Sequence, residues 1–390
     1  MTYNFNKIID RKKTNSAKYE MTKAVFGTDD ILPMWVADMD FETPDFIVNA
    51  IQKRTNHHLF GYSSKPDSFY DSIINWMKKR HNWNVKREWI TSSPGVVPAL
   101  NLSVLAFTNP NDKIIIQPPV YHLFASAVKD NNRTLINNQL KLENGKYEID
   151  FDDLENKIKD DIKMLIFCNP HNPVGAVWNK KDLLRLGNLC LENDVLLVSD
   201  EIHSDLVFDQ KHIPIASLSP EIANNTITCM APSKTFNLAG LSTSEIIISN
   251  EEIREKFNHL LHNLHIHYGN IFGNIALESA YTYGEEWLEQ LLKYLKNNID
   301  FLVEYFEKYI PKIKVIIPDA TYLIWLDCRE LNLSDDELKK FFIKDVKIGL
   351  NDGISFGPGG EGFQRINIAY PKSIIEKAVE RIKNVMNDKF

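Results

Sequence analysis

The sequence has few cysteines, and their spacing argues against a disulfide framework. Its 390 residues include four cysteines, and no two of them form a Cys-x-x-Cys pair. Cys168 and Cys229 lie in apolar runs, KMLIFC and TITCM, where a cysteine usually acts as a small hydrophobic residue. We therefore expect reduced thiols and a cytoplasmic protein.

Long hydrophobic runs and clusters of basic residues are also missing. No uninterrupted apolar run approaches the roughly 18 residues that a membrane helix needs, and the first residues, MTYNFNKIIDRKKTN, lack the apolar core of a secretion signal. The formal net charge is −7, and the longest basic runs, 11–13 and 78–80, have three residues each. Nucleic-acid binding needs clustered Lys and Arg. We expect neither a membrane nor a nucleic-acid partner.

What the sequence does contain is a series of short apolar runs between residues 90 and 250. They have no polar face, as is typical of strands covered by helices on both sides. One intervening segment, 180–194, carries leucines at helical spacing. The pattern predicts an α/β fold with a mostly parallel sheet. The predicted strands are KIIIQPP (113–119), KMLIFCNP (163–170), DVLLVSDE (194–201), TITCMAPSK (226–234) and EIIIS (245–249).

The pattern changes after about residue 285. A long amphipathic helix is predicted over 285–309, followed by the strands KVIIP and YLIWLD and by further helices. The first 45 residues contain no clear strand–helix unit and are expected to pack against this region. We therefore predict a large domain over 46–284 and a smaller α+β domain formed by 1–45 with 285–390.

Three predicted strands end in polar residues. The loop Asn169–Gly175 (NPHNPVG), the pair Asp200-Glu201 and the pair Ser233-Lys234 each follow an apolar run. Ligands of an open parallel sheet bind outside the carboxyl ends of its strands, so these groups are expected to converge. Pyridoxal phosphate (PLP) requires such a set: an amine for a Schiff base, a carboxylate at the ring nitrogen, a donor to the phenolate oxygen and an anion site.

Over essentially its whole length the chain resembles the fold-type I PLP enzymes, the aspartate-aminotransferase superfamily. Asn169–Gly175 is similar to the family's Asn-Pro-x-Asn-Pro-x-Gly loop, and Lys234 lies 34 positions after Asp200 (234 − 200 = 34), in the family's order. A narrower resemblance is to the cystathionine β-lyase or C–S lyase branch, the MalY/PatB type. The segments that carry it are PMWVADMDF (33–41), FGYS (60–63) and DEIHSD (200–205).

This resemblance implies roles for the residues nearest the cofactor ring. Lys234 would form the Schiff base and then remove the substrate's α-proton, for which the lowered pKa of a buried amine is suited. Asp200 would pair with the pyridinium, and Asn172 would donate to the phenolate oxygen. Tyr121 would stack on the ring.

The phosphate and the substrate carboxylate have their own predicted partners. Backbone groups of Gly95, Val96 and Val97, at the start of a predicted helix, would bind the phosphate. Tyr62 would reach the phosphate of a neighbouring subunit, which implies a homodimer with a shared active site. Arg365 would receive the substrate's α-carboxylate, since a guanidinium suits bidentate binding, and a backbone group of Ala37 would touch the same carboxylate.

The sequence departs from the family at three positions. Ser242 stands where many relatives have a phosphate-binding arginine, and Ala231 stands where a serine is common. His203 replaces the tyrosine that contacts the phenolate oxygen in typical aminotransferases. Phosphate binding would then depend on residues 95–97, Tyr62 and Ser233, and His203 is a candidate substitute for the missing tyrosine.

A group of histidines, His262, His265 and His267, has spacing that could suggest a metal site. No cysteine or carboxylate completes a ligand set there, and PLP already supplies an electron sink. We therefore predict no metal.

The resemblance to the C–S lyase branch favours α,β-elimination from L-cystathionine or another L-cysteine S-conjugate, an amino-acid thioether. The products would be pyruvate, ammonia and a thiol such as homocysteine. An aminotransferase would use the same residues and remains an alternative. A non-catalytic PLP-binding regulator is a third, less favoured because such regulators typically carry an additional DNA-binding domain.

Overall fold

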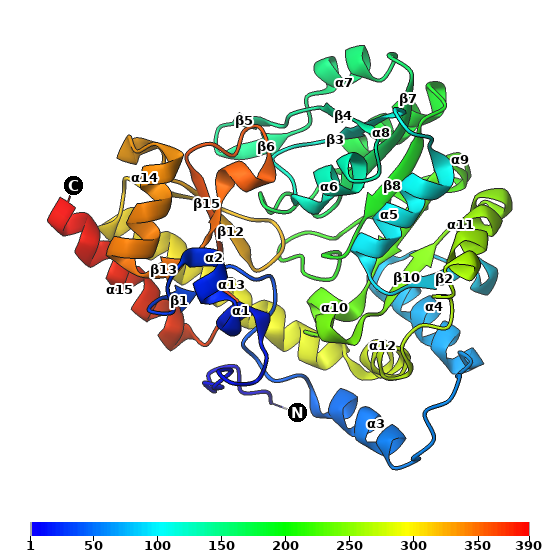
Figure 1. Cartoon of the computed structure of the whole chain (residues 1–390), viewed down its shortest axis with the longest axis horizontal. Coiled ribbons are helices and arrows are strands. Elements are labelled where there is room, and N and C mark those ends of the chain that lie inside the picture. The colour runs from blue at the N-terminus through cyan, green and yellow to red at the C-terminus, as the bar shows by residue number, and fades with distance from the viewer. Residues whose placement is uncertain (1, 390) are drawn as a thin grey trace.

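A seven-stranded sheet forms the centre of the larger part of the molecule (Figure 1). The structure is a computed structural model, and it describes residues 2–389. From one edge to the other the strands are β2 (Ile90–Ser93), β10 (Ser244–Ile247), β9 (Thr226–Met230), β8 (Leu196–Asp200), β7 (Ile162–Cys168), β3 (Lys113–Ile116) and β4 (Thr134–Asn137).

The sheet is mostly parallel, as predicted. Strands β9, β8, β7, β3 and β4 run parallel to one another, whereas β10 is antiparallel to both β9 and β2. The five strands predicted between residues 90 and 250 are all present but end earlier than predicted. The run predicted over 113–119 ends as a strand at Ile116, because Pro118 and Pro119 have no N–H to donate to a ladder.

Alternate residues of the central strands enter two separate hydrophobic cores. In β7, Met164 and Ile166 belong to one core, and Leu165 and Phe167 belong to the other. Successive side chains of a strand point to opposite faces, so a sheet covered on both sides needs apolar residues at every position. One core packs against α5 (Val96–Phe107), α6 (Leu123–Lys129) and α11 (Glu251–Asn263); the other packs against α7 (Phe151–Lys157), α8 (Lys180–Glu192) and α9 (Pro220–Asn224).

A four-stranded antiparallel sheet forms the smaller part. Its order is β11 (Lys314–Ile316), β12 (Leu323–Asp327), β15 (Phe363–Asn367) and β14 (Asn351–Asp352). It packs with α13 (Glu285–Tyr309), whose ends are those predicted, and with α14 (Asp335–Lys340) and α15 (Lys372–Lys389). The N-terminal residues join this part, since β1 (Leu32–Pro33) pairs with β13 (Ile348–Gly349).

The division into 46–284 and 1–45 with 285–390 remains our proposal. Two separate sheets support it. The largest hydrophobic core nevertheless crosses the proposed boundary, because it contains residues of α3 (Asp45–Thr55), α4 (Asp67–His81) and α12 (Ile271–Tyr283) together with residues of α13 and β12. The two parts therefore share a packed interface.

The remaining elements are short. They are α1 (Ala17–Glu20), α2 (Thr22–Phe26), α10 (Pro232–Thr235), the hairpin β5 (Lys141–Glu143) with β6 (Lys146–Glu148), the 3₁₀ turns Arg87–Trp89, Ile215–Ser217, Ala239–Leu241, Arg329–Leu331 and Gly353–Phe356, and the π-helical turn Phe341–Val346. Within residues 2–389, no helix is both long enough and apolar enough to cross a membrane.

Candidate active site

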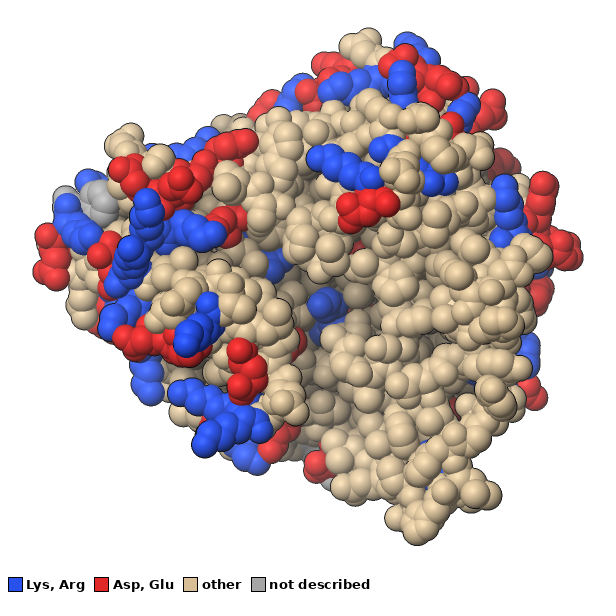
Figure 2. Space-filling view, in the orientation of Figure 1, with Lys and Arg blue, Asp and Glu red and all other residues tan. Residues whose placement is uncertain are grey.

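A pocket of about 200 Å³ lies at the carboxyl ends of β7, β8 and β9. Figure 2 shows the cleft between the two parts of the molecule, with basic side chains at its depth. Most of the residues predicted for the site line this pocket. They are Ala37, Gly95, Val96, Val97, Tyr121, Asn172, Asp200, His203, Ser233 and Lys234.

Lys234 lies on α10, the four-residue helix that follows β9, and its Nζ donates to the carbonyl oxygen of Ala37 at 2.7 Å. Burial, followed by the charge of Arg365, lowers the pKa of the Lys234 amine to about 8. The carboxylates of Asp38 and Asp200 act in the opposite direction. A much larger share of this amine is neutral near pH 7 than of a solvent-exposed lysine, and the neutral amine is the form that attacks an aldehyde.

Asp200 is the last residue of β8 and is 4% exposed. Its Oδ1 accepts from the N–H of Ile202 at 3.1 Å. Burial raises the pKa of Asp200 to about 7, although that N–H and the charge of Lys234 partly offset the effect. A buried carboxyl group with few hydrogen-bond partners becomes more stable as an anion when a cation lies beside it. A protonated ring nitrogen in the pocket would supply this positive charge.

Arg365 comes from β15 of the smaller part and crosses to the loop after β7. Its Nη1 donates to Oδ1 of Asn172 at 3.0 Å, and its Nη2 donates to Asn351 Oδ1 at 2.6 Å and to the carbonyl oxygen of Trp35 at 2.9 Å. The Nε of Arg365 is buried without a partner among the described residues. Because Arg365 uses the Asn172 oxygen, the amide nitrogen of Asn172 remains to donate into the pocket.

Tyr121 and His203 lie on different walls of the pocket. The backbone N–H of Tyr121 donates to the carbonyl oxygen of Asn172 at 3.0 Å. This hydrogen bond fixes the relative positions of these two residues, which are both predicted to contact the cofactor ring. Burial, together with the charges of Lys234 and Arg365, lowers the pKa of His203 to about 3. The ring of His203 is therefore neutral, and its Nδ1 is buried without a partner in the part of the chain that the structure describes.

The anion site is the start of α5. No side chain caps this end, and Gly95 precedes the first helical residue, Val96. The N–H groups of the first turn of a helix have no partner within the helix, so those of Val96 and Val97 are available to an anion. Ser242 and Thr243 line the same pocket.

Tyr62, in contrast, lies outside the pocket. It is 95% exposed on the loop between α3 and α4 and contacts the ring of Tyr268, with ring centroids 5.3 Å apart. The cavity beside it, of about 620 Å³, borders the site pocket at Pro94 and Ser242. The predicted contact of Tyr62 with a neighbouring subunit stays a prediction.

The segment 35–39 forms one wall of the site, and every one of its carbonyl oxygens accepts a hydrogen bond from a side chain. Its donors come from both parts of the molecule. They are Arg365 to Trp35, Asn367 to Val36 at 2.6 Å, Lys234 and Tyr322 to Ala37, Asn367 and Lys18 to Asp38, and Asn237 and Arg11 to Met39.

Only some of the residues at and around the pocket could be predicted from the sequence. Tyr322, Asn351, Asn367 and Thr243 belong to no motif with a chemical meaning, and nothing local in the sequence indicated them. Asn237 lies three residues after Lys234, and this proximity was the one available signal. The Ala37 carbonyl holds the lysine amine, so its predicted contact with substrate would have to use another backbone atom.

The histidine group lies away from the pocket. His262 and His267 stack with their ring centroids 4.0 Å apart, and His267 lies 4.1 Å from the ring of Tyr268. Among residues 2–389, no group of three or more His, Cys, Asp or Glu side chains is arranged to hold a metal ion.

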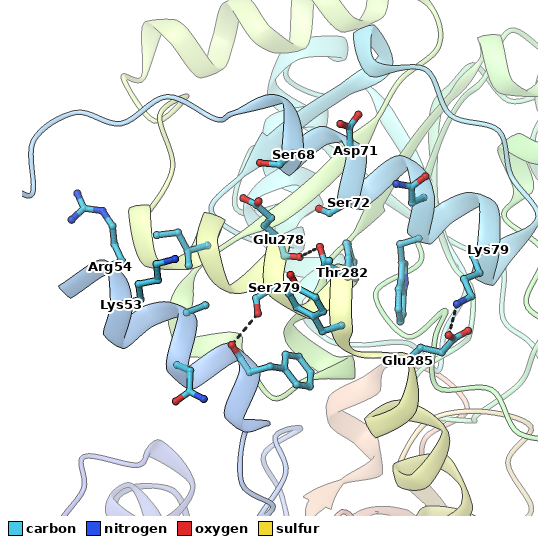
Figure 3. A pocket seen from close by; sticks show the side chains of 18 of the residues that line it. Lys53, Arg54, Ser68, Asp71, Ser72, Lys79, Glu278, Ser279, Thr282 and Glu285 are labelled. Atoms are coloured by element: carbon cyan, nitrogen blue, oxygen red, sulfur yellow. Dashed lines mark hydrogen bonds and ion pairs between the residues drawn. The ribbon is translucent and has the colours of Figure 1, made fainter. Parts of the chain in front are cut away.

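A larger groove, of about 990 Å³, lies between α3, α4 and α12 (Figure 3). Its labelled polar side chains include Lys53, Asp71 and the paired Lys79 and Glu285. Lys53, Asp71 and Lys79 are exposed to solvent. The smaller pocket, with its buried charges of opposite sign, is the candidate for catalysis.

The pocket residues fit the cofactor that the resemblance implies. The half-buried amine, the carboxyl with a raised pKa, the uncapped helix and the unpartnered Nδ1 of His203 each match one group of PLP. The Asn172 amide would be the donor to the phenolate oxygen.

Comparison with known proteins agrees with this geometry. Residues 29–382 match the family model "Aminotransferase class I and II". The chain belongs to this family. It is 45% identical to cystathionine β-lyase PatB of Bacillus subtilis, over 98% of this chain and all of that protein.

Two solved structures are similar over their whole length. Cystalysin from Treponema denticola, which contains pyridoxal 5'-phosphate, superposes with a TM-score of 0.97 at 37% identity, covering 100% of each chain. The PLP-bound C–S lyase from Staphylococcus hominis gives a TM-score of 0.92 at 38% identity, over 99% of this chain and 98% of that one.

The lowered pKa of Lys234 gives a prediction for the cofactor-free protein. We expect the rate of PLP uptake to rise about tenfold per pH unit below pH 8 and to level off above it, because the neutral amine is the reactive form. Growth of the visible absorbance band, followed by stopped flow from pH 6 to 10, measures this rate. A midpoint near 10.5, the value of an ordinary lysine, would contradict it.

A second prediction concerns Arg365. Arg365→Ala should raise KM for amino-acid substrates by about 100-fold, since a buried charged partner of the carboxylate is lost, while PLP remains bound. Arg329→Ala is the matched control: both guanidinium groups lie 4.9 Å from a phenylalanine ring, but Arg329 is on the surface. Equal KM values for the two variants would remove the carboxylate role from Arg365.

Proposed function

We propose that this chain is a PLP-dependent C–S lyase that cleaves L-cystathionine or related L-cysteine S-conjugates. With water, L-cystathionine yields pyruvate, ammonia and homocysteine. The observation that carries the proposal is that Lys234 and Asp200 line one pocket and that Arg365 is close enough for its charge to lower the pKa of Lys234, in a chain 45% identical to a cystathionine β-lyase.

When bound, PLP supplies an aldehyde for the amine and a ring that withdraws electrons from the substrate's α-carbon. The protein supplies the proton transfer. Nζ of Lys234 is the only lysine amine lining the pocket among the described residues, and with a pKa of about 8 it can take the α-proton and release it again near neutral pH.

Arg365 orients the substrate. Its hydrogen bonds to Asn172, Asn351 and Trp35 hold the guanidinium in place before substrate arrives, so little side-chain entropy is lost on binding. Binding the α-carboxylate there would also place a negative charge beside the Lys234 amine, whose pKa Arg365 otherwise lowers.

An aminotransferase would use the same three side chains. The C–S lyase is preferred because two of the three relatives described above are named as a cystathionine β-lyase and a C–S lyase. The two activities differ in their need for a second substrate, since elimination needs no 2-oxo acid.

The chain is further proposed to act as a homodimer in the cytoplasm. Leu59, Phe60 and Tyr62 are 72%, 57% and 95% exposed, and Phe60 and Tyr62 line the cavity that borders the site pocket. Figure 2 shows few charged side chains over this lower right face. In a two-fold dimer such a patch packs against its own copy, which would bring the partner's loop to this rim. All four cysteines are free and buried, which suits a reducing compartment.

The activity is tested with pure protein, PLP and L-cystathionine, without a 2-oxo acid. We expect pyruvate and homocysteine in equal amounts from the unaltered protein and from the control Lys293→Ala, and none from Lys234→Ala, because no amine remains in the pocket. Product that depends on added 2-oxoglutarate would indicate the aminotransferase. A shift of the visible band without turnover would indicate the regulator.

The shared site is tested by mixing chains. Lys234→Ala and Tyr62→Ala chains, unfolded and refolded together, should recover about a quarter of wild-type activity, because half the dimers are hybrids and each hybrid holds one intact site. Tyr283→Ala, at another exposed tyrosine, serves as the control in place of Tyr62→Ala and should be fully active alone. No recovery above the two separate variants would show that Tyr62 does not serve a partner.

A further inference from the structure

Asp205 is a buried carboxylate outside the pocket that holds the residue next to the active-site lysine. It is 3% exposed. Its Oδ2 accepts from the hydroxyl of Thr235 at 2.9 Å. Its Oδ1 accepts from Nε1 of Trp76 at 3.1 Å and lies 3.0 Å from Nε2 of His81.

These contacts join three elements that the site needs in a fixed arrangement. Thr235 is the last residue of α10 and directly follows Lys234. Trp76 and His81 are on the final turns of α4. Asp205 itself belongs to the turn that begins at Asp200, so it connects the carboxylate side of the pocket to the amine side.

The helix α10 depends on such a contact. It has four residues and no side-chain cap, and a helix of this length is not stable by itself. Thr235 is fully buried, so loss of its acceptor would leave a hydroxyl without a partner.

The charge of Asp205 strengthens the contact. Burial acts to raise its pKa, but the hydrogen bond with His81, the charge of Arg80 and the hydrogen bond from Thr235 overcome burial and lower it. Burial lowers the pKa of His81 itself, so His81 contributes a hydrogen bond and not a charge. Asp205 is therefore ionised, and hydrogen bonds to an ionised acceptor are about twice as strong as neutral ones.

The Asp200 side of the pocket is held independently. Glu201, the next residue, is fully buried, accepts from Ser199 Oγ at 2.8 Å and lies 2.6 Å from Nε2 of His212. The strand end is thus fixed without Asp205. The Asp205–Thr235 bond is the side-chain hydrogen bond by which this turn reaches α10.

We propose that Asp205 is a positioning residue that fixes the Lys234 amine relative to the Asp200 carboxylate through the Thr235 hydroxyl. The inference rests on the proposed role of Lys234 in binding PLP. Lys234 and Asp200 keep the roles already proposed for them. Asp205 affects only how accurately the Lys234 amine is placed relative to the Asp200 carboxylate. A misplacement of about 1 Å can lower a rate by on the order of 100-fold.

The test compares Thr235→Val, which removes the hydroxyl at nearly constant volume, with Thr235→Ser, which keeps it. Thr226→Val is the matched control, because Thr226 is also buried and donates to the carbonyl oxygen of Ile222 at 2.6 Å, away from the pocket. Five quantities are measured for each: the Kd of PLP, the pH midpoint of its visible band, kcat and KM with L-cystathionine, and Tm.

We expect Thr235→Val to weaken PLP binding and lower kcat by about tenfold each, to move the pH midpoint and to leave KM within about twofold. Thr235→Ser should restore PLP binding, kcat and the pH midpoint, and Thr226→Val should change Tm alone. Asp205→Asn, if it folds, should resemble Thr235→Val. If Thr235→Val changes only Tm, as the control does, the proposal is overturned. The Kd and pH midpoint need no substrate, so they test it even if L-cystathionine is not cleaved.

Discussion

The backbone of residues 35–39 is the part of the structure on which the site depends. Carbonyl oxygens there accept hydrogen bonds from Lys234 of the larger part and from Arg365, Asn367 and Tyr322 of the smaller part. A peptide carbonyl has two lone pairs, so Ala37 can hold the lysine amine and the tyrosine hydroxyl together. The N-terminal segment thus sets how the amine-bearing part of the chain and the carboxylate-binding part meet.

That segment is itself anchored by charge. Lys18 is fully buried and forms ion pairs with Asp38 at 2.7 Å and Asp40 at 2.9 Å, and Arg11 pairs with the same two carboxylates. The two positive and two negative side chains neutralise one another, which offsets the cost of burying them. Removal of any one of the four side chains would leave a charge without a partner of opposite sign. The ion cluster and the pocket differ in this respect. In the pocket Asp200 has no such balance and its pKa is raised.

Much of the fold followed from local patterns. The amphipathic repeat of 285–309 predicted both ends of α13, and apolar runs predicted the strand that ends at Asp200 and the strand that precedes Lys234. The antiparallel direction of β10 was not indicated, because a run apolar on both faces reads the same in either direction.

Site residues that belong to motifs at strand ends could be predicted from the sequence. Residues that reach the site through contacts between distant segments could not. The lysine, aspartate and asparagine motifs lie at strand ends and share one edge of the sheet. Asn351 reaches the site through the pairing of β14 with β15, which places it opposite Arg365, and Tyr322 directly precedes β12, which pairs with the other side of β15. Asp205 could not be separated in the sequence from any other turn aspartate, since its partners Trp76 and Thr235 lie 129 and 30 positions away.

Helix α13 extends from the lysine-bearing segment into the smaller part of the molecule. Its first turn packs beside the lysine-bearing segment, where the rings of Trp287 and Phe236 lie 5.5 Å apart, and its remaining turns support the smaller part. A helix of 25 residues is roughly 37 Å long, so a tilt of about 5° at its start displaces its far end by about 3 Å. A change in the packing of Trp287 against Phe236 would therefore displace the carboxyl end of α13 more than its first turn.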